Sequence, residues 1–253
     1  EEEEDGGVNM DDMFPREDIS GKITAKLVKD LDSANWKERQ AALQEVDQIL
    51  IGANNRILPP TGDLIPALKG RLKDTNKNLI AAAIKTIGAL AQAMGAPFRH
   101  ELSKVAADCV KNFSDSKPVV RSAVSEMLSA CVAGIPLKHV LPYVSEYFPT
   151  AKASTDGKKE AMSWLAGAAG GKVQEADLPE AMRICALGLG DKDSGVRTEA
   201  NRALGALAGA VGSAALVGAA GGLKSKERDV VLPAIDKAAG GAAPAPAAPM
   251  ARP

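Results

Sequence analysis

Five copies of one short pattern recur along the chain, and this repeat restricts the fold more than any other feature. Each copy has an apolar residue, a polar turn and a helix-like run with small or apolar residues at fixed positions. The copies begin at Leu31, Leu72, Phe113, Leu189 and Leu223. In all five, the position nine residues after the third residue of the copy is Ala or Val. A register kept over this length predicts one structural unit used repeatedly.

The spacing of the copies indicates the kind of unit. Their third residues lie 41, 41, 76 and 34 residues apart, and the interval of 76 leaves room for a degenerate copy in "KASTDGKKEAMSWLAG", where Asp156 is expected to open a helix. A period near 40 with two helices per unit is typical of HEAT or armadillo repeats, whose units bury their apolar faces against neighbours. We therefore predict an all-α solenoid of about six HEAT repeats, each a helix pair, with no sheet.

Helix-like periodicity supports this prediction. Apolar residues of 36–51 fall on one stripe, and 79–94 has almost no polar side, as expected for a helix between neighbours. Residues 61–72 and 177–189 open with Thr or Asp and acidic character, which favours a helix start. The aromatic content of only 3% argues against a sandwich or barrel, because strands are rich in aromatic residues.

Composition divides the chain into three parts. Residues 1–18 are predicted to be an acidic flexible arm, since 1–12 hold seven acidic residues and no basic one. The solenoid is expected over 19–240, and the Ala/Pro-rich residues 241–253 are expected to form a flexible linker. Without the acidic start, the remaining residues carry a net charge of +6, which suits an acidic partner but also serves solubility alone.

No set of residues suggests catalysis, a metal or a cofactor, so we predict none of these. His100 and His139 are the only histidines, and neither lies in a motif with an acid or a nucleophile. Cys109, Cys131 and Cys185 are scattered in apolar surroundings and are expected to be buried and reduced. Nucleic-acid binding is not expected either, because the 29 basic residues of 19–240 are diluted by 23 acidic ones and form no dense cluster.

One uncharged run, residues 203–223, has the length of a membrane helix. It consists mostly of Ala and Gly, whose transfer into lipid is poorly favourable, and Gly212-Ser213 offers a break between two shorter helices. We therefore expect two helices of a folded domain and no contact with a membrane.

In a stack of helix pairs, the turn inside each pair lies on the same edge, so the turn residues form a row. Every predicted turn contributes a lysine. The turns are expected at Asn35-Trp36-Lys37, Thr75-Asn76-Lys77, Ser116-Lys117-Pro118, Gly157-Lys158-Lys159, Lys192-Asp193-Ser194 and Lys224-Ser225-Lys226. Solvated turns also tolerate lysines, but a tryptophan among them favours an edge that binds another protein.

Three side chains of this row have alternative roles. Trp36 either offers its ring to a partner or folds back on the helices of its own unit. Arg121 and Arg197 follow valines at equivalent positions, where an arginine can tie one unit to an aspartate of a neighbouring turn, here Asp74, Asp115 or Asp191. We expect this structural role for Arg121. The second tryptophan, Trp164, lies in the apolar "AMSWLAG" and is predicted to be a core residue.

Most of the chain resembles the TOG domains of microtubule polymerases, which are built from six HEAT units, and the resemblance is specific in the first three units. The resemblance rests on "PREDISGKITAKLVKDLDSANWKERQAALQEV", "GDLIPALKGRLKDTNKNLIAAAIKTIGALAQAMG", "SDSKPVVRSAV" and "GDKDSGVRTEA". It implies a domain that binds the αβ-tubulin heterodimer or the microtubule lattice and supports microtubule growth, at microtubules, spindle and centrosome in the cytoplasm. The isolated domain is expected to be a monomer, similar to a middle or later member of a TOG array.

The resemblance also assigns binding residues. It makes Trp36 the anchor on β-tubulin and adds polar and basic residues of the turns on that side: Lys37, Thr75, Asn76, Lys77, Lys117 and Pro118. Lys192, Gly195 and Arg197 are placed nearer α-tubulin. The alternative function is that of a general HEAT scaffold which binds another protein through its concave face.

Overall fold

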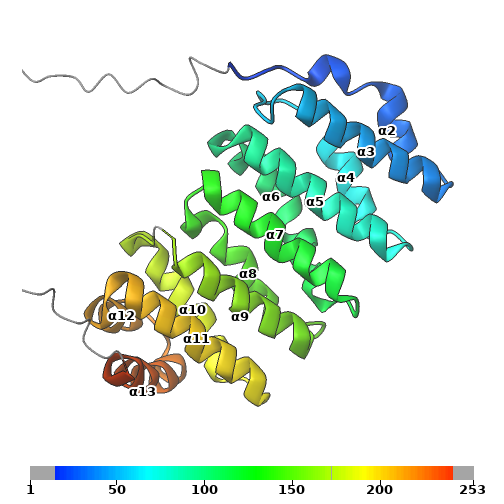
Figure 1. Cartoon of the computed structure of the whole chain (residues 1–253). Coiled ribbons are helices and arrows are strands. Elements are labelled where there is room, and N and C mark those ends of the chain that lie inside the picture. Colours follow the sequence, from blue (N-terminus) through cyan, green and yellow to red (C-terminus); the bar gives the residue numbers. More distant parts are fainter. Residues whose placement is uncertain (1–14, 172, 242–253) are drawn as a thin grey trace, which may run out of the picture. The chain divides into compact units, whose positions relative to one another are not determined.

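The computed structural model describes residues 15–171 and 173–241, and twelve α-helices, α2 to α13, lie in these ranges (Figure 1). The described residues contain no strand, only an isolated parallel bridge between Glu17 and Ile57. The predicted all-α solenoid of helix pairs is therefore confirmed.

The helices follow one another as antiparallel pairs. Their bounds are α2 (Ala25–Leu31), α3 (Trp36–Gly52), α4 (Leu64–Arg71), α5 (Lys77–Met94), α6 (Arg99–Val110), α7 (Pro118–Gly134), α8 (Leu141–Tyr147), α9 (Thr155–Ala169), α10 (Leu178–Leu189), α11 (Ser194–Val211), α12 (Ser213–Ala220) and α13 (Ser225–Gly241). The helices predicted in 36–51, 61–72, 79–94 and 177–189 are all present, as α3, α4, α5 and α10.

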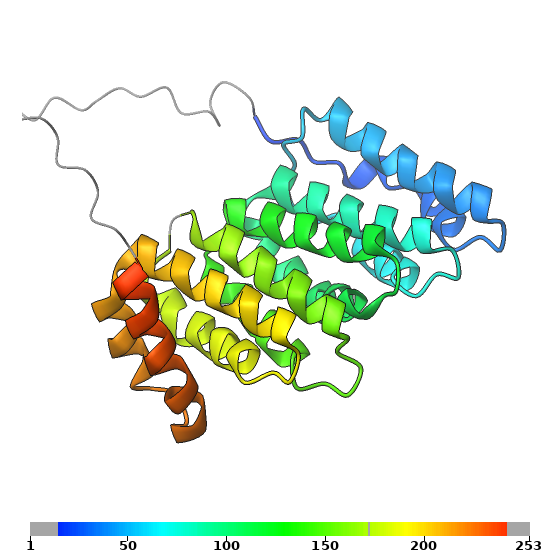
Figure 2. The same ribbon diagram turned by 60° about the horizontal axis from the view of Figure 1, so that its bottom comes forward.

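The chain forms two compact units, Glu1–Ala161 and Met162–Pro253, and each is described by itself. In the first, α3, α5 and α7 pack side by side in one layer, while α2, α4, α6 and α8 form the other (Figures 1 and 2). A β-carbon on Gly88 of α5 would lie only 3.0 Å from the Cα of Met127 in α7, so the two backbones approach closely. In the second unit, α13 packs on α10, α11 and α12.

The core is aliphatic and includes the side chains predicted to be buried. Cys109, Cys131 and Cys185 are buried free thiols, and Trp164 is only 5% exposed. Burial raises the pKa of Cys131 and Cys185 to about 12. Burial also raises the pKa of Cys109 far above its ordinary value. These thiols therefore stay protonated and unreactive at neutral pH.

The uncharged run folds as predicted. Helix α11 ends at Val211, Gly212 takes a φ of 83°, and α12 begins at Ser213. Among the described residues, no single helix has the length and apolarity to cross a membrane. Only α11 and α12 taken together meet those two criteria, and they are bent by 115°.

The predicted domain boundaries stay predictions. Residues 1–14 and 242–253, which hold most of the two expected arms, lie outside the described residues. Just before the boundary expected at 19, Arg16 donates hydrogen bonds to the carbonyls of Ala93 and Met94, and the Glu17 amide donates to the Arg56 carbonyl. The chain thus already contacts α5 and the loop after α3 at residues 16 and 17.

A half-buried carboxylate between α3 and α5 yields a first prediction. Asp47 accepts a hydrogen bond of 3.1 Å from the hydroxyl of Thr86, yet burial raises the pKa of Asp47 above its ordinary value. A raised folded-state pKa favours folding below the unfolded-state pKa and loses that benefit as the pH rises through the folded value. Asp47→Asn keeps an oxygen acceptor for Thr86 and should raise the unfolding free energy at pH 7 by about 0.5 kcal/mol, after allowance for solvent screening.

Thermal melting at two pH values tests this. The gain should disappear at pH values below about 4, where wild-type Asp47 is itself protonated. Glu45→Gln, which alters an exposed acid on the same helix, should show no such gain. An Asp47→Asn variant that melts below the wild type at pH 7 would show that the ionised form stabilises the pair of helices.

Candidate functional site

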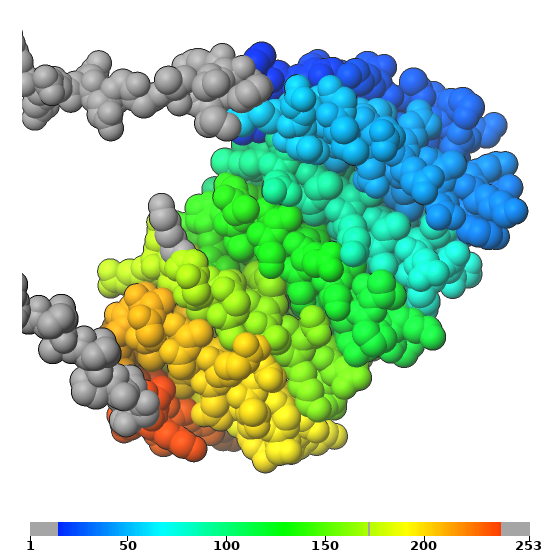
Figure 3. Space-filling view, viewed as in Figure 1, coloured from blue at the N-terminus to red at the C-terminus, as the bar shows by residue number. Residues whose placement is uncertain are grey.

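The turns before α3, α5 and α7 lie along one edge of the first unit, because the three helices run in the same direction (Figures 1 and 2). The blue segment that joins α2 to α3 protrudes at the end of this edge in the space-filling view (Figure 3). We call the turn residues 33–37, 74–78 and 115–119 the turn edge.

The turns share one local geometry, which explains the repeat register. In four of the five copies, the side chain of the third residue accepts a hydrogen bond from the backbone N–H two positions later. The distances are 3.1 Å for Ser33 with Asn35, 2.9 Å for Asp74 with Asn76, and 2.9 Å for Asp115 with Lys117. Short polar side chains that bond forward to the backbone stabilise such turns. The same bond joins Asp191 to Asp193 in the second unit, at 2.9 Å.

Asparagine caps then fix where two of the helices begin. The side chain of Asn35 accepts from the Lys37 amide, and that of Asn76 from the Asn78 amide, each at 3.0 Å. Because Asn35 and Asn76 are N-cap residues, Trp36 and Lys77 are the first residues of α3 and α5. The Asn76 side-chain oxygen accepts this capping bond, while its amide nitrogen has two N–H groups to donate.

Three arginines, each six residues after the third residue of its copy, stabilise the turns through hydrogen bonds to the turn carbonyls. One guanidinium nitrogen of Arg39, Arg121 and Arg197 donates to two successive carbonyls of the same turn, at 2.7 to 3.2 Å. The structural role expected for Arg121 is thus confirmed, but the predicted identity of its aspartate partner was wrong. The Nη2 atom of Arg121 lies 3.5 Å from the carboxylate of Asp156, and the ion pair is not with Asp74, Asp115 or Asp191.

Arg39 makes the strongest of these contacts. Its Nε and Nη2 donate to the two carboxylate oxygens of Asp74 at 2.7 and 2.9 Å, and both side chains are almost fully buried. Arg71 adds a third bond to Asp74 at 3.2 Å. Burial alone raises the pKa of Asp74, but the hydrogen bonds from Arg39 and the Asn76 amide, with the two arginine charges, lower it overall. This network joins the turns of the first two repeats.

Trp36 lies in the open at the head of the turn edge. Its side chain is 47% exposed, and the ammonium of Lys37 lies 5.9 Å from the centre of its ring. The predicted exposure is confirmed, and the alternative that the ring folds back into its own unit is wrong. An exposed indole with a neighbouring cation offers a flat apolar face to a partner. Tryptophan is among the residue types most enriched at binding hot spots.

The other predicted residues of the first unit lie along the same edge. Thr75, Lys77, Lys117 and Pro118 are exposed, and Asn76 is partly exposed. Lys77 reaches to the next turn, where its ammonium lies 2.6 Å from the Asp115 carboxylate. Val119, 46% exposed directly after Pro118, adds exposed apolar surface to this edge that was not predicted from the sequence. The sequence signal that could have indicated this surface is the pair of valines in "KPVV", because only one of them, Val120, is buried.

The remaining predicted residues belong to the second unit. Lys192 and Arg197 are exposed, and Gly195 is partly exposed in the first turn of α11. The carboxylate of Asp193 accepts from the Val196 amide at 3.0 Å and caps this helix. Arg197 holds its own turn, as described above, so a contact with a partner would have to use its other nitrogens.

The fourth predicted turn was misplaced. Gly157, Lys158 and Lys159 lie inside α9, which begins at Thr155, and the turn before it spans 148–154. A β-carbon on Gly157 would lie 2.2 Å from the Phe113 carbonyl oxygen, so this glycine permits close packing within a helix. The lysine of the fourth turn is Lys152.

No protein-family profile matches the chain. In sequence, the chain is 36% identical to the protein MOR1 of Oryza sativa subsp. japonica over 190 residues, which cover 75% of this chain and 10% of MOR1. In structure, it matches a chain solved to explain microtubule plus end tracking by XMAP215, CLIP-170 and EB1, with a TM-score of 0.72, 23% identity, and coverage of 92% of this chain and 97% of that one. It also matches Drosophila melanogaster Mini spindles TOG3, with a TM-score of 0.64, 20% identity, and coverage of 88% and 97%. The chain belongs to the TOG-domain family. This TOG domain spans about a tenth of the length of the relatives that it matches, and its predicted place as a middle or later member of an array stays a prediction.

Proposed function

We propose that this TOG domain binds the αβ-tubulin heterodimer through its turn edge, with Trp36 as the anchor. The observation that carries the proposal is a large aromatic side chain held in solvent by a capped helix start, at the head of a row of exposed polar and basic turns. Lys37, Thr75, Asn76, Lys77, Lys117 and Pro118 would surround the anchor. Lys192, Gly195 and Arg197 are proposed as further contacts from the second unit.

We propose that, as part of an array of such domains, this domain has a role in microtubule growth at microtubules, spindle and centrosome in the cytoplasm. The domain contributes binding and no catalysis of its own. One domain can hold a tubulin dimer but cannot also tether it to a lattice, so promotion of growth requires further binding domains on the same chain. The proposed folded part is residues 19–240, to which Arg16 and Glu17 add contacts, and the proposed flexible segments lie outside these residues.

A binding experiment with purified tubulin tests the proposal against the alternative of a general scaffold. The full chain should co-elute with soluble tubulin in gel filtration at low ionic strength, as a one-to-one complex. A scaffold that uses its concave face would leave tubulin in its own peak. In that case the turn edge has another role.

The lysines of the turn edge should act mainly on the rate of association. Charges at the rim of an interface steer the encounter more than they hold the complex. Lys77→Glu and Lys117→Glu should each lower the association rate constant about three- to tenfold at low salt, with a smaller difference at high salt because salt screens the charges. Stopped-flow or biolayer measurements at several salt concentrations provide the check.

Lys85→Glu is the matched control. Lys85 lies on the same helix as Lys77 and, like Lys77, pairs with an acid of the next repeat, here Glu126 of α7 at 3.0 Å, but it lies about two helical turns beyond the turn edge. It should change the association rate little. An equal slowing by all three substitutions would indicate a nonspecific effect of net charge.

A further inference from the structure

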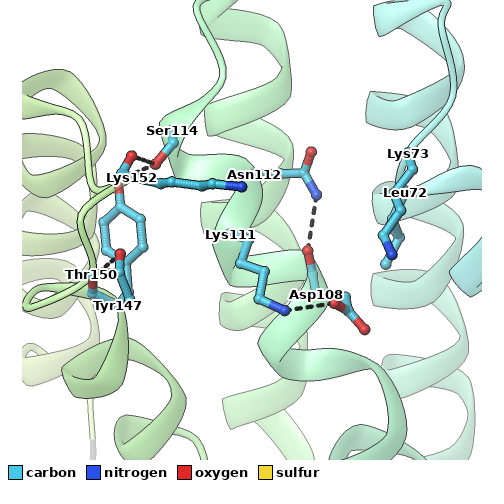
Figure 4. Close-up of a pocket in the computed structure, with 9 residues that line it drawn as sticks. All are labelled: Leu72, Lys73, Asp108, Lys111, Asn112, Ser114, Tyr147, Thr150 and Lys152. Carbon is cyan, nitrogen blue, oxygen red and sulfur yellow. Dashed lines mark hydrogen bonds and ion pairs between the residues drawn. The ribbon is translucent and has the colours of Figure 1, made fainter.

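A pocket of about 230 Å³ opens beside the turn edge, on the side of the first helices (Figure 4). Its lining comes from three successive repeats: the end of α4, the end of α6 with the short helix after it, and the end of α8 with the turn after it. Each repeat contributes one lysine, namely Lys73, Lys111 and Lys152. No role was assigned to these three lysines from the sequence.

The lining carries an excess of positive charge. Asp108 is its one acidic residue, and the ammonium groups of Lys111 and Lys69 pair with it at 2.9 and 3.1 Å. Hydrogen bonding to Lys111 lowers the pKa of Asp108, so it is ionised and its charge is already balanced. Within the described residues, Lys73 and Lys152 have no acidic partner. In Figure 4 the Lys152 side chain extends across the pocket towards Asn112.

The wall between the lysines is rigid and partly apolar. The Ser114 hydroxyl donates to the Lys152 carbonyl at 2.5 Å and lies 3.1 Å from the Tyr147 hydroxyl. The Tyr147 hydroxyl also accepts from the Ser154 amide at 3.2 Å. These bonds fix the turn that carries Lys152, while the Tyr147 ring and Leu72 supply apolar surface. An apolar floor with ammonium groups at the rim suits a side chain that has an aliphatic stem and a terminal carboxylate.

We propose that this pocket binds an acidic peptide segment of the protein docked on the turn edge, with a glutamate side chain in the pocket and neighbouring carboxylates at Lys73 and Lys152. Position supports the assignment to the docked partner. Lys73 lies two residues before Thr75, and Ser114 three residues before Lys117, so a protein that covers the turn edge also passes the pocket. The inference rests on the proposed function for the identity of the partner.

Fluorescence anisotropy with a labelled oligoglutamate peptide tests the pocket directly. The full chain should bind the peptide at low salt and should not bind oligoglutamine. Lys73→Gln together with Lys152→Gln should weaken peptide binding about tenfold. Lys85→Gln with Lys104→Gln removes the same charge from exposed lysines elsewhere in the first unit and should weaken it less than about twofold. Equal weakening by both pairs overturns the pocket assignment, provided that both variants melt like the wild type.

Two further arms separate the sources of the peptide and the two proposals. The chain carries an acidic stretch of its own, so a variant with Glu1, Glu2, Glu3 and Glu4 changed to Gln is compared with the wild type. Equal peptide affinity supports an external partner, whereas clearly tighter peptide binding by the variant means that the chain's own segment competes for the pocket, which overturns the assignment to a partner.

Trp36→Ala should leave peptide binding unchanged, so a failure of tubulin binding is distinguishable from a failure of the pocket. In gel filtration with tubulin, a smaller fraction of the Lys73 and Lys152 double variant than of the control pair should co-elute with tubulin. Equal co-elution overturns the link to the docked protein.

Discussion

Trp36→Ala is expected to weaken tubulin binding by about 2 kcal/mol or more, a loss of about thirtyfold in affinity, while the domain remains folded. The indole is 47% exposed, so its removal leaves no internal cavity, and the unfolding free energy should change by less than about 1 kcal/mol. A buried tryptophan would behave in the opposite way and cost about 3 to 5 kcal/mol of stability. Titration calorimetry with tubulin, beside thermal melting of the same samples, measures both quantities.

The same helix provides a matched control. Ile51 is 57% exposed near the end of α3, fifteen residues beyond Trp36 and therefore about 22 Å away along the helix axis. Ile51→Ala removes exposed apolar surface at the opposite edge of the unit and should leave tubulin binding unchanged. If Trp36→Ala binds tubulin as tightly as Ile51→Ala does, Trp36 is not the anchor and the proposed interface is wrong.

The repeat register predicted most of the first unit because local signals and packing agree there. Asn35 and Asn76 supply caps, and the apolar stripes of the helices begin where the caps place them. The exposure of Trp36 followed from its place in a predicted polar turn, because the turns of stacked helix pairs lie at the edge of the stack. Val119 was missed because a valine beside Pro118 has the same sequence signature whether it packs inward or faces solvent.

Two features required tertiary information. Gly157 was predicted in a turn, but it lies inside α9, where the Phe113 carbonyl oxygen approaches too closely for any side chain. Sequence cannot show which backbone will pass so near a glycine. Arg39 was missed although it occupies the same repeat position as Arg121 and Arg197, six residues after the third position of its copy. Aligning that column across all five copies would have revealed it, but not its burial against Asp74.

Asp74→Ala is expected to cause the largest loss of stability, about 3 to 5 kcal/mol of unfolding free energy, because it leaves the buried Arg39 guanidinium without a counter-ion. Arg39 Nε and Nη2 would lose both carboxylate partners, and the Asn76 amide would lose its acceptor in the turn. Asp115→Ala is the matched control. The corresponding Lys77 side chain is 45% exposed and its ammonium can be hydrated, so this loss should be about 1 kcal/mol.

A double substitution separates the unpaired charge from the loss of the side chain. Arg39→Met combined with Asp74→Leu replaces the buried pair by apolar groups of similar size and should recover much of the loss seen in Asp74→Leu alone. The pH dependence gives an independent reading. The pKa of Asp74 is lowered on folding, so its contribution is complete above the unfolded-state pKa near 4 and is lost as the pH falls through the lower folded value. Melting temperatures of the double variant should therefore fall less steeply below pH 4 than those of the wild type. If the double variant is as unstable as Asp74→Leu, the unpaired Arg39 charge is not the cause of the loss. The turn geometry itself then depends on the bonds from Arg39 to the turn carbonyls.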